Sequence, residues 1–198
     1  MIFLARAYEV LGLRKKRKWE KVFEVGVAKT GTSSLGKAFK ILGLRVTGWS
    51  QDLYDEVIEG NYENALAYAE NFEAFRDGPW HEVDLYKRLD EKFPRSKFIL
   101  LERDDESWIK SIEKFFSADI NWNNVDEKYL IKNFSEKVQA LLEFKHNRFN
   151  DVKEYFRDRP DDLLIMNICA GEGWEKLCPF LKMPVPKVKF PHEFKTEI

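Results

Sequence analysis

The chain has 198 residues, of which 44% are hydrophobic and 34% charged, a composition typical of one globular domain with a full core. Its 33 basic and 34 acidic residues leave a formal net charge of −1, so no overall charge attracts the protein to nucleic acid or to an anionic membrane. Two cysteines, Cys169 and Cys178, are too few for a disulfide framework or a four-ligand zinc site, and we expect both to be buried, reduced thiols. Any anion site must therefore be local.

The first twenty residues are expected to form a helical and basic lead-in. The opening stretch MIFLARAYEVLGL is apolar, but Arg6 and Glu9 interrupt it and no small-residue cleavage site follows. It is therefore expected to be neither a signal peptide nor a membrane-spanning helix. The basic run at 14–18 is interpreted as a solvated surface segment and not as a nucleic-acid contact. These features predict a cytoplasmic protein with no membrane span and no nucleic-acid partner.

Strands and helices are predicted to alternate from residue 22 onward. The apolar run at 22–27 predicts a buried strand, and the helical spacing at 33–42 predicts the helix that follows it. The elements expected after these are a short strand at 45–49, helices at 51–58, 61–75 and 81–93, a strand at 96–102, a helix at 104–116, a long amphipathic stretch to about 158, a strand at 163–168 and a helix at 173–181. No repeat or linker divides the chain, so one domain is expected over 1–198, ending in an extended tail at 183–198.

This alternation predicts a fold class. Strands that alternate with helices favour an α/β fold of three layers, similar to the P-loop fold, in which a central parallel sheet carries helices on both faces. In such sheets ligands bind beyond the carboxyl ends of the strands. The segments that follow the predicted strands at 22–27 and 96–102 are therefore the first places to look for a site.

A phosphate-binding loop is predicted between the first strand and the first helix. Gly26 and Gly31 have the spacing of the nucleoside-triphosphate loop GxxxxGK[ST], but Thr32 stands where that loop has its lysine. The lysine here is Lys29, two residues before Gly31. The backbone amides of Gly31, Thr32 and Ser33 can still converge on an anion at the start of the helix. Lys29 would then approach the ligand from within the loop.

A second anion-binding feature follows the predicted strand at 96–102. Arg103 comes directly after Glu102 at the end of this strand, where its guanidinium can make forked bonds to a phosphate. Such a positive charge does not suit a site for magnesium, so the sequence predicts a metal-free site for a doubly anionic nucleotide. Eight residues later, Ser111 lies on the flank of a predicted helix. The core stripe of that helix is expected to consist of Trp108, Ile112, Phe115 and Phe116.

Together these motifs resemble those of sulfotransferases that use 3′-phosphoadenosine 5′-phosphosulfate (PAPS). The loop KTGTSS at 29–34 is similar to the family's 5′-phosphosulfate loop, and Arg103 with Ser111 resembles the arginine and serine that bind the donor's 3′-phosphate. The stretch DLLIMNICAGEGWEKLCPFL at 162–181 is also similar to one found in a branch of small sulfotransferase-like proteins. The resemblance covers roughly residues 23 to 192.

The resemblance implies a sulfotransferase that moves a sulfuryl group from PAPS to a hydroxyl or amine of a small-molecule or glycan acceptor, without a metal. Lys29 would neutralise charge on the leaving phosphate oxygen and would be catalytic as well as donor-binding. The implied donor contacts are Lys29, Thr30, Gly31, Thr32, Ser33, Ser34, Arg103 and Ser111. Adenine would need a stacking ring other than the family's tryptophan, and Trp49 and Phe39 are the candidates. The basic, glycine-containing segment that gives cytosolic members extra 3′-phosphate contacts is not visible in the tail, which leaves two alternatives: weaker donor affinity, or contacts from Lys187 and Lys189.

The catalytic base is expected in the turn at Asp77-Gly78-Pro79. Cytosolic sulfotransferases carry a histidine in a His-x-Pro turn at this point, and Asp77 takes its place here. A carboxylate can accept the acceptor's proton if its surroundings raise its affinity for that proton. His81 and Glu82 stay open as alternatives.

Two other classes of protein also stay open. A small nucleotide kinase with an altered loop would bind ATP with magnesium, and a non-catalytic module of the same fold would bind 3′,5′-phosphoadenosine without transferring anything. The acceptor pocket is expected to lie between residues 49 and 75 and at the Asn-rich loop 121–124. The sequence specifies neither the acceptor nor the oligomeric state.

Overall fold

The computed structural model describes residues 17–82, 84–117 and 134–193. Its centre is a five-stranded parallel sheet in the order β2-β3-β1-β4-β5. The strands are β1 (Val22–Val25), β2 (Val46–Thr47), β3 (Ala74–Phe75), β4 (Lys97–Leu101) and β5 (Leu163–Met166). Most of the predicted lead-in and the Asn-rich loop at 121–124 lie outside the described residues.

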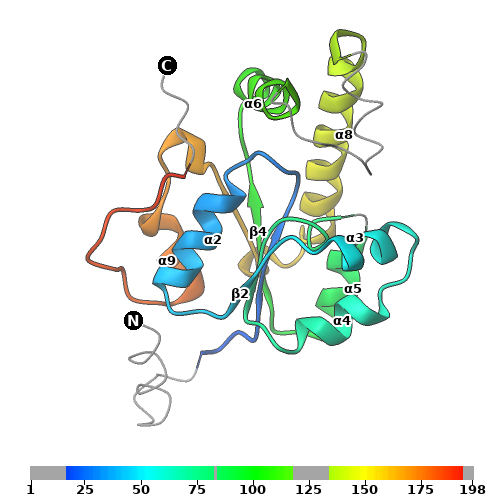
Figure 1. Cartoon of the computed structure of the whole chain (residues 1–198). Coiled ribbons are helices and arrows are strands. Elements are labelled where there is room, and N and C mark those ends of the chain that lie inside the picture. Colours follow the sequence, from blue (N-terminus) through cyan, green and yellow to red (C-terminus); the bar gives the residue numbers. More distant parts are fainter. Residues whose placement is uncertain (1–16, 83, 118–133, 194–198) are drawn as a thin grey trace.

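Helices cover both faces of this sheet (Figure 1). On one face lie α2 (Thr32–Ile41) and α9 (Trp174–Leu181). On the other lie α3 (Gln51–Ile58), α4 (Glu63–Ala69), α5 (Leu85–Lys92) and α8 (Phe134–Tyr155). The helix α6 (Asp105–Ser117) follows the carboxyl end of β4. The prediction of a three-layer α/β fold with a central parallel sheet is confirmed.

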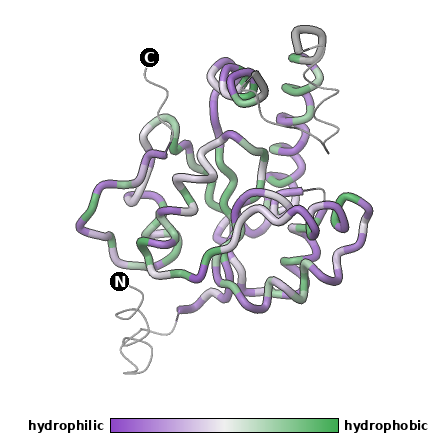
Figure 2. Tube along the Cα trace, in the orientation of Figure 1, coloured by the Kyte–Doolittle hydropathy of each residue, from purple (hydrophilic) through white to green (hydrophobic). Residues whose placement is uncertain are grey.

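Alternate residues of the central strands supply two separate cores. Phe23 stacks on Phe75 and Phe98, with ring centroids 4.5 and 5.5 Å apart, and this group packs against α4, α5 and α8. Val22 and Ile99 point to the opposite core, between the sheet and the helices α2 and α9. Strands buried on both faces read as continuous apolar runs, which is why the sequence indicates them clearly. In Figure 2 the surrounding helices instead mix hydrophobic and hydrophilic segments.

The prediction of one helix from residue 61 to 75 was wrong. The helix α4 ends at Ala69, and the chain then turns to form β3, which pairs with β1 on one side and β2 on the other. Two paired residues are too few to show a strand's period in the sequence, so tertiary pairing decides their conformation. The helix expected from residue 81 begins only at Leu85, because turns hold the segment before it, with Glu82 N donating to Pro79 O.

The tail after α9 lies along the protein without a helix or strand as far as residue 193 (Figure 1). Trp174 Nε1 donates to Val188 O at 2.8 Å, and the ring of Phe190 packs on that of Trp174. A Cβ at Gly173 would lie 2.8 Å from Phe190, so the glycine permits this contact. At its described end, Glu193 N donates to Ser34 Oγ at 2.9 Å. Glu193 of the tail therefore lies beside the first turn of α2.

Candidate functional site

The segment between β1 and α2 has a conformation that depends on its glycines. Gly26 and Gly31 have φ of 139° and 110°, a region that other residues rarely adopt. A Cβ at Gly31 would lie only 3.3 Å from Ile168 Cβ, so the segment after β5 packs directly against this loop. Thr30 is fully buried, and its hydroxyl donates to Val27 O at 2.8 Å, which closes the turn. The sequence therefore folds here into a rigid loop at the carboxyl edge of the sheet.

The first turn of α2, which follows the loop, suits an anion. Gly31 is its N-cap, so no side chain caps the helix, and no acidic residue lies in its first turn. The first amides of a helix have no intrahelical acceptor, and the helix dipole favours negative charge there. Thr32 is buried and Ser33 half-buried at this turn, whereas the hydroxyl of Ser34 accepts the hydrogen bond from Glu193. Among the predicted hydroxyls, that of Ser34 is therefore engaged by the tail.

Lys29 brings a positive charge into this loop. Its backbone is left-handed, with φ of 67°, which costs a residue other than glycine about 1 kcal/mol or more. Its Nζ lies 4.0 Å from the ring centroid of Phe115 on α6. Burial lowers the pKa of Lys29, and Arg103 lowers it further while Asp77 opposes both. Lys29 is therefore within electrostatic reach of two other residues predicted for the site.

Arg103 ties the end of β4 to the loop. Its Nη1 donates to Lys29 O at 2.9 Å, and its Nε donates to Ser107 Oγ at 2.9 Å. The structure thus brings Arg103 and the loop together as predicted, but joins the guanidinium to Ser107 instead of Ser111. Ser111 is half-buried one helical turn beyond Ser107, so the two hydroxyls lie on the same side of α6. Sequence reasoning missed Ser107, although a hydroxyl four residues after the arginine was a usable signal.

A buried lysine on α8 holds the backbone of this arginine. Lys145 on α8 is only 1% exposed, and its Nζ donates to Arg103 O and to Asp105 Oδ1, both at 2.6 Å. Its ammonium also lies over the rings of Trp108 and Phe149. Nothing in the sequence indicated this residue, because it lies in a long amphipathic helix where lysines usually face solvent. It fixes the backbone from which Arg103 projects.

Several sequence expectations about this side of the site were wrong. Phe115 is 37% exposed and its ring contacts the Lys29 ammonium, so it does not belong to the core with Trp108 and Ile112. Cys169 is exposed, with its Sγ 3.8 Å from Thr30 O, because it lies in the segment that packs on the loop; only Cys178 is buried. Phe39 is fully buried in the core between α2 and the sheet, so it cannot stack on adenine.

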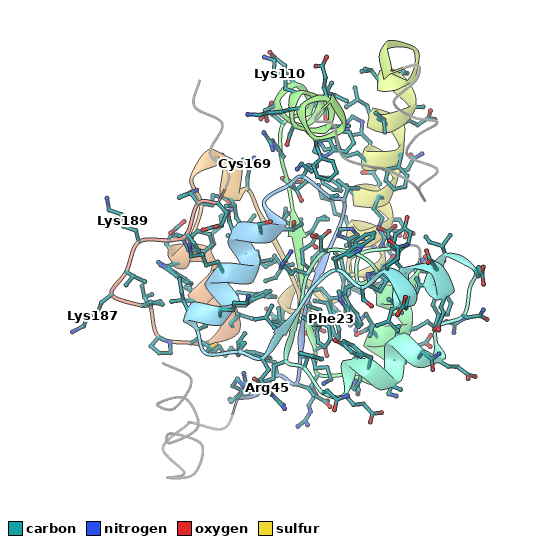
Figure 3. The ribbon with its side chains drawn as sticks, viewed as in Figure 1. Phe23, Arg45, Lys110, Cys169, Lys187 and Lys189 are labelled. Atoms are coloured by element: carbon teal, nitrogen blue, oxygen red, sulfur yellow. The ribbon has the colours of Figure 1, made fainter. Side chains whose placement is uncertain are left out.

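Two further details concern charge around the site. Glu102, which follows β4, pairs with Lys153 Nζ at 2.7 Å, and no cluster of His, Cys, Asp and Glu side chains suited to a metal occurs in the described part of the chain. Lys187 and Lys189 extend from the tail away from the body of the protein (Figure 3). They do not point toward the loop (Figure 3), which favours the other alternative, weaker donor affinity, over donor contacts from these lysines.

Asp77 lies on the other side of the loop, two residues after the end of β3. Its backbone is left-handed, with φ of 67°, and its carboxylate is about a quarter exposed. One oxygen accepts from Arg76 Nη1 at 3.1 Å and the other from Gly78 N at 3.2 Å. The ring of Trp49 covers Gly78, where a Cβ would lie 2.6 Å from Trp49 Cζ3. Trp49 therefore lies beside Asp77, and its ring packs on that of Tyr54 with centroids 4.9 Å apart.

His81 is buried beneath Asp77. Its Nδ1 lies 3.0 Å from Glu24 Oε2 and its Nε2 lies 3.2 Å from Glu82 Oε1. Burial alone would lower the pKa of His81, but the two carboxylates, Glu24 above all, outweigh it and raise the pKa to about 10. The side chain is thus an imidazolium that donates from both nitrogens. This arrangement does not suit a base, and it leaves Asp77 and Glu82, whose side chains are 28% and 22% exposed, as the accessible candidates.

The parallel sheet, the glycine loop with an uncapped helix, and the arginine at the end of the next strand define an α/β protein of the P-loop-like type. A model of the sulfotransferase domain matches residues 21–197, and the chain belongs to this family. The chain is also similar to the Ava biosynthesis cluster protein M of Aspergillus versicolor. The two are 25% identical over 214 residues, which cover 87% of this chain and 80% of that protein.

Proposed function

We propose that this protein transfers a sulfuryl group from PAPS to a hydroxyl or amine of a small-molecule acceptor. The observation that carries the proposal is the 2.9 Å hydrogen bond from Arg103 Nη1 to Lys29 O. It joins the lysine-bearing loop to the arginine at the end of β4, so that two sites for phosphate lie side by side. PAPS carries phosphate at both the 5′ and the 3′ position, which matches this pair.

Each phosphate has its own set of residues. The amides and hydroxyls of Thr32 and Ser33 at the start of α2 suit the 5′-phosphate, since a helix N-terminus attracts an anion. Arg103, Ser107 and Ser111 suit the 3′-phosphate. In this structure, the Arg103 guanidinium donates to two neutral groups, the Ser107 hydroxyl and the Lys29 carbonyl. Bonds from arginine to phosphate are charge-assisted and stronger, so a phosphate would compete well for these donors.

The same edge holds the groups that the transfer needs. In the reaction the bond between sulfur and the donor's phosphate oxygen breaks, and a bond between sulfur and the acceptor atom forms. Lys29 is placed to neutralise charge on the departing phosphate, and Asp77 to take the acceptor's proton. Arg103 and Lys29 supply the positive charge at this edge, while Glu102 is paired with Lys153. We therefore propose a transfer that needs no metal.

The acceptor is assigned to the side of β2 and β3. Trp49 is 52% exposed, and its ring with that of Tyr54 borders the Asp77 turn. Arg103 lies on the opposite side of the loop, so Trp49 is placed for the acceptor and not for adenine. An exposed ring beside the base suits an acceptor with a flat apolar face. The two free cysteines fit the cytoplasm as the proposed location, because thiols stay reduced there.

The donor site is tested by calorimetric titration with 3′,5′-phosphoadenosine, with and without magnesium, and with ATP for comparison. We expect binding that does not depend on magnesium. Arg103→Ala should weaken it about a hundredfold, since a charged partner of a phosphate is lost. Arg95→Ala is the matched control, because Arg95 is exposed before the other end of β4 and has no part in the site. Binding of ATP with magnesium, and none of the bisphosphate, would instead indicate a kinase.

Transfer is tested separately from binding. The purified protein is incubated with PAPS and a panel of phenols, alcohols and amines, and release of 3′,5′-phosphoadenosine is followed. Release that depends on an acceptor and disappears in Lys29→Met supports the proposal. Tight binding of the bisphosphate without release in any arm would identify a non-catalytic module of the same fold.

A further inference from the structure

A carboxylate is buried beneath the site, in the first strand. Glu24 of β1 is fully buried, and its Oε2 accepts two hydrogen bonds, from Asp77 N at 3.0 Å and from His81 Nδ1 at 3.0 Å. Its other oxygen, Oε1, has no hydrogen-bond partner among the described residues and lies on the side of Gly26. Glu24 thus connects the loop that follows β1 with the turn that follows β3. The sequence does not indicate this, since Glu24 reads as one polar residue in an apolar strand.

The charge of Glu24 is balanced within the protein. His81 is 4% exposed and donates to Glu24 and to Glu82, and its carbonyl accepts from Arg148 Nη2 at 2.6 Å. Asp77, Glu82 and Arg148 are therefore the other charged groups around the pair. Breaking such a pair by removing one partner is costly, whereas replacing both partners with apolar residues is often neutral or stabilising. Stability alone is thus a weak explanation for a buried pair at this position.

We propose that Glu24, with His81 as its counter-ion, is the positioning residue for Asp77: its carboxylate holds the Asp77 amide, and so keeps the Asp77 side chain within electrostatic reach of Lys29. The amide needs such an anchor because Asp77 is left-handed, with φ of 67°, a conformation that is strained outside glycine. The role rests on the proposed function, in which Asp77 is the base. Glu24 itself is fully buried and does not touch the acceptor.

Lys29 reports the position of Asp77 without any ligand. The charged neighbours that shift the pKa of Lys29 are Asp77, which raises it, and Arg103, which lowers it, so we expect a change at Glu24 to reach Lys29 through Asp77. The titration of Lys29 can be followed by carbon NMR of its ε-methylene, assigned with Lys29→Arg. Removing a negative neighbour disfavours the ammonium, so Asp77→Asn should move the Lys29 titration to lower pH.

Two double variants separate positioning from packing. Glu24→Leu with His81→Leu replaces the pair by apolar side chains and leaves the Asp77 amide without its acceptor. Glu24→Gln with His81→Asn keeps an oxygen for that amide and removes the charges. We call the first double variant the apolar pair and the second the polar pair. We expect the apolar pair to shift the Lys29 titration to lower pH, as Asp77→Asn does, and the polar pair to leave it near the wild-type value. Adding Asp77→Asn to the apolar pair should cause no further shift.

An unchanged Lys29 titration in the apolar pair would overturn the proposal. A difference in the Lys29 titration between Asp77→Asn alone and Asp77→Asn combined with the apolar pair would overturn it too. The wild-type protein gives a further measurement that needs no variant. The Asp77 amide should exchange with solvent at least about a hundredfold more slowly than an unprotected amide, because it donates to a buried carboxylate. Exchange at the unprotected rate would also reject the role, even if the apolar pair failed to fold.

Kinetics distinguishes this proposal from the proposed function. In the apolar pair we expect kcat for release of 3′,5′-phosphoadenosine from PAPS to fall about 10- to 100-fold, with affinity for the bisphosphate unchanged, since misplacing a catalytic group slows chemistry and not donor binding. If Asp77→Asn does not slow release, Asp77 is not the base, and the assigned chemistry fails. If Asp77→Asn slows release but the apolar pair does not, only the role of Glu24 fails.

Discussion

The two sides of the sheet's carboxyl edge are built in different ways. On the side of β1 and β4, the predicted donor groups come from a loop and a strand end whose spacing is visible in the sequence, and Arg103 binds backbone and hydroxyl oxygens. On the side of β2 and β3, each strand has only two residues, and a turn with a buried ion pair beneath it carries Asp77. The proposed donor site is thus formed by short motifs in the sequence. The proposed acceptor site is formed by segments that lie far apart in the sequence.

The strongest way to separate the two sides is Asp77→Asn. This change keeps the shape of the side chain and removes its ability to take a proton, so we expect kcat to fall by about 10³-fold. Affinity for 3′,5′-phosphoadenosine should stay within about twofold, because the donor side is intact. Transfer assays and calorimetry on the same preparation measure the two effects, with Asp52→Asn on the exposed surface as the control. Equal losses in both measurements would mean that the two sides are not independent.

A change in pH is expected to act on the stability that the buried pair contributes. The folded protein raises the pKa of His81 from 6.5 to about 10, so it binds this proton more tightly than the unfolded chain. The stabilisation is complete below pH 6.5 and is lost as the pH rises to about 10, by at most about 1.4 kcal/mol for each pH unit. Urea unfolding of the wild type and of Glu24→Gln with His81→Asn between pH 6 and 10 measures it. A difference in unfolding free energy that stays constant over this range would contradict the assignment.

The smallest effect is expected from Trp49→Ala. Loss of a stacking ring costs about 1 kcal/mol, so KM for a ring-bearing acceptor such as 2-naphthol should rise about fivefold. KM for PAPS should not change, because Trp49 lies beside Asp77 and away from Arg103. Phe144→Ala is the control, since Phe144 is similarly exposed on α8. A rise in KM for PAPS would instead place adenine against Trp49 and reverse the assignment of the two sides.

The sequence predicted the arrangement on the side of β1 and β4 better than that on the side of β2 and β3, and the reason is the range of the contacts. Gly31, Lys29 and Arg103 are recognisable because each lies in the short segment that follows a buried strand, so local spacing is enough. The bond between Glu24 and Asp77 spans 53 positions and depends on β3, which is too short to be read as a strand. Lys145 was missed for the same reason, because its partner Arg103 is 42 positions away.

The exposed thiol beside the loop also offers an experimental handle. Cys169 Sγ lies 3.8 Å from Thr30 O, while Cys178, the second of the two cysteines, is buried. Burial of part of the side chain raises the pKa of the Cys169 thiol, so a maleimide or iodoacetamide dye would react best at mildly alkaline pH. The native chain would then carry a single fluorophore next to the loop between β1 and α2, with no engineered cysteine. Its emission would test the proposed nucleotide binding in real time.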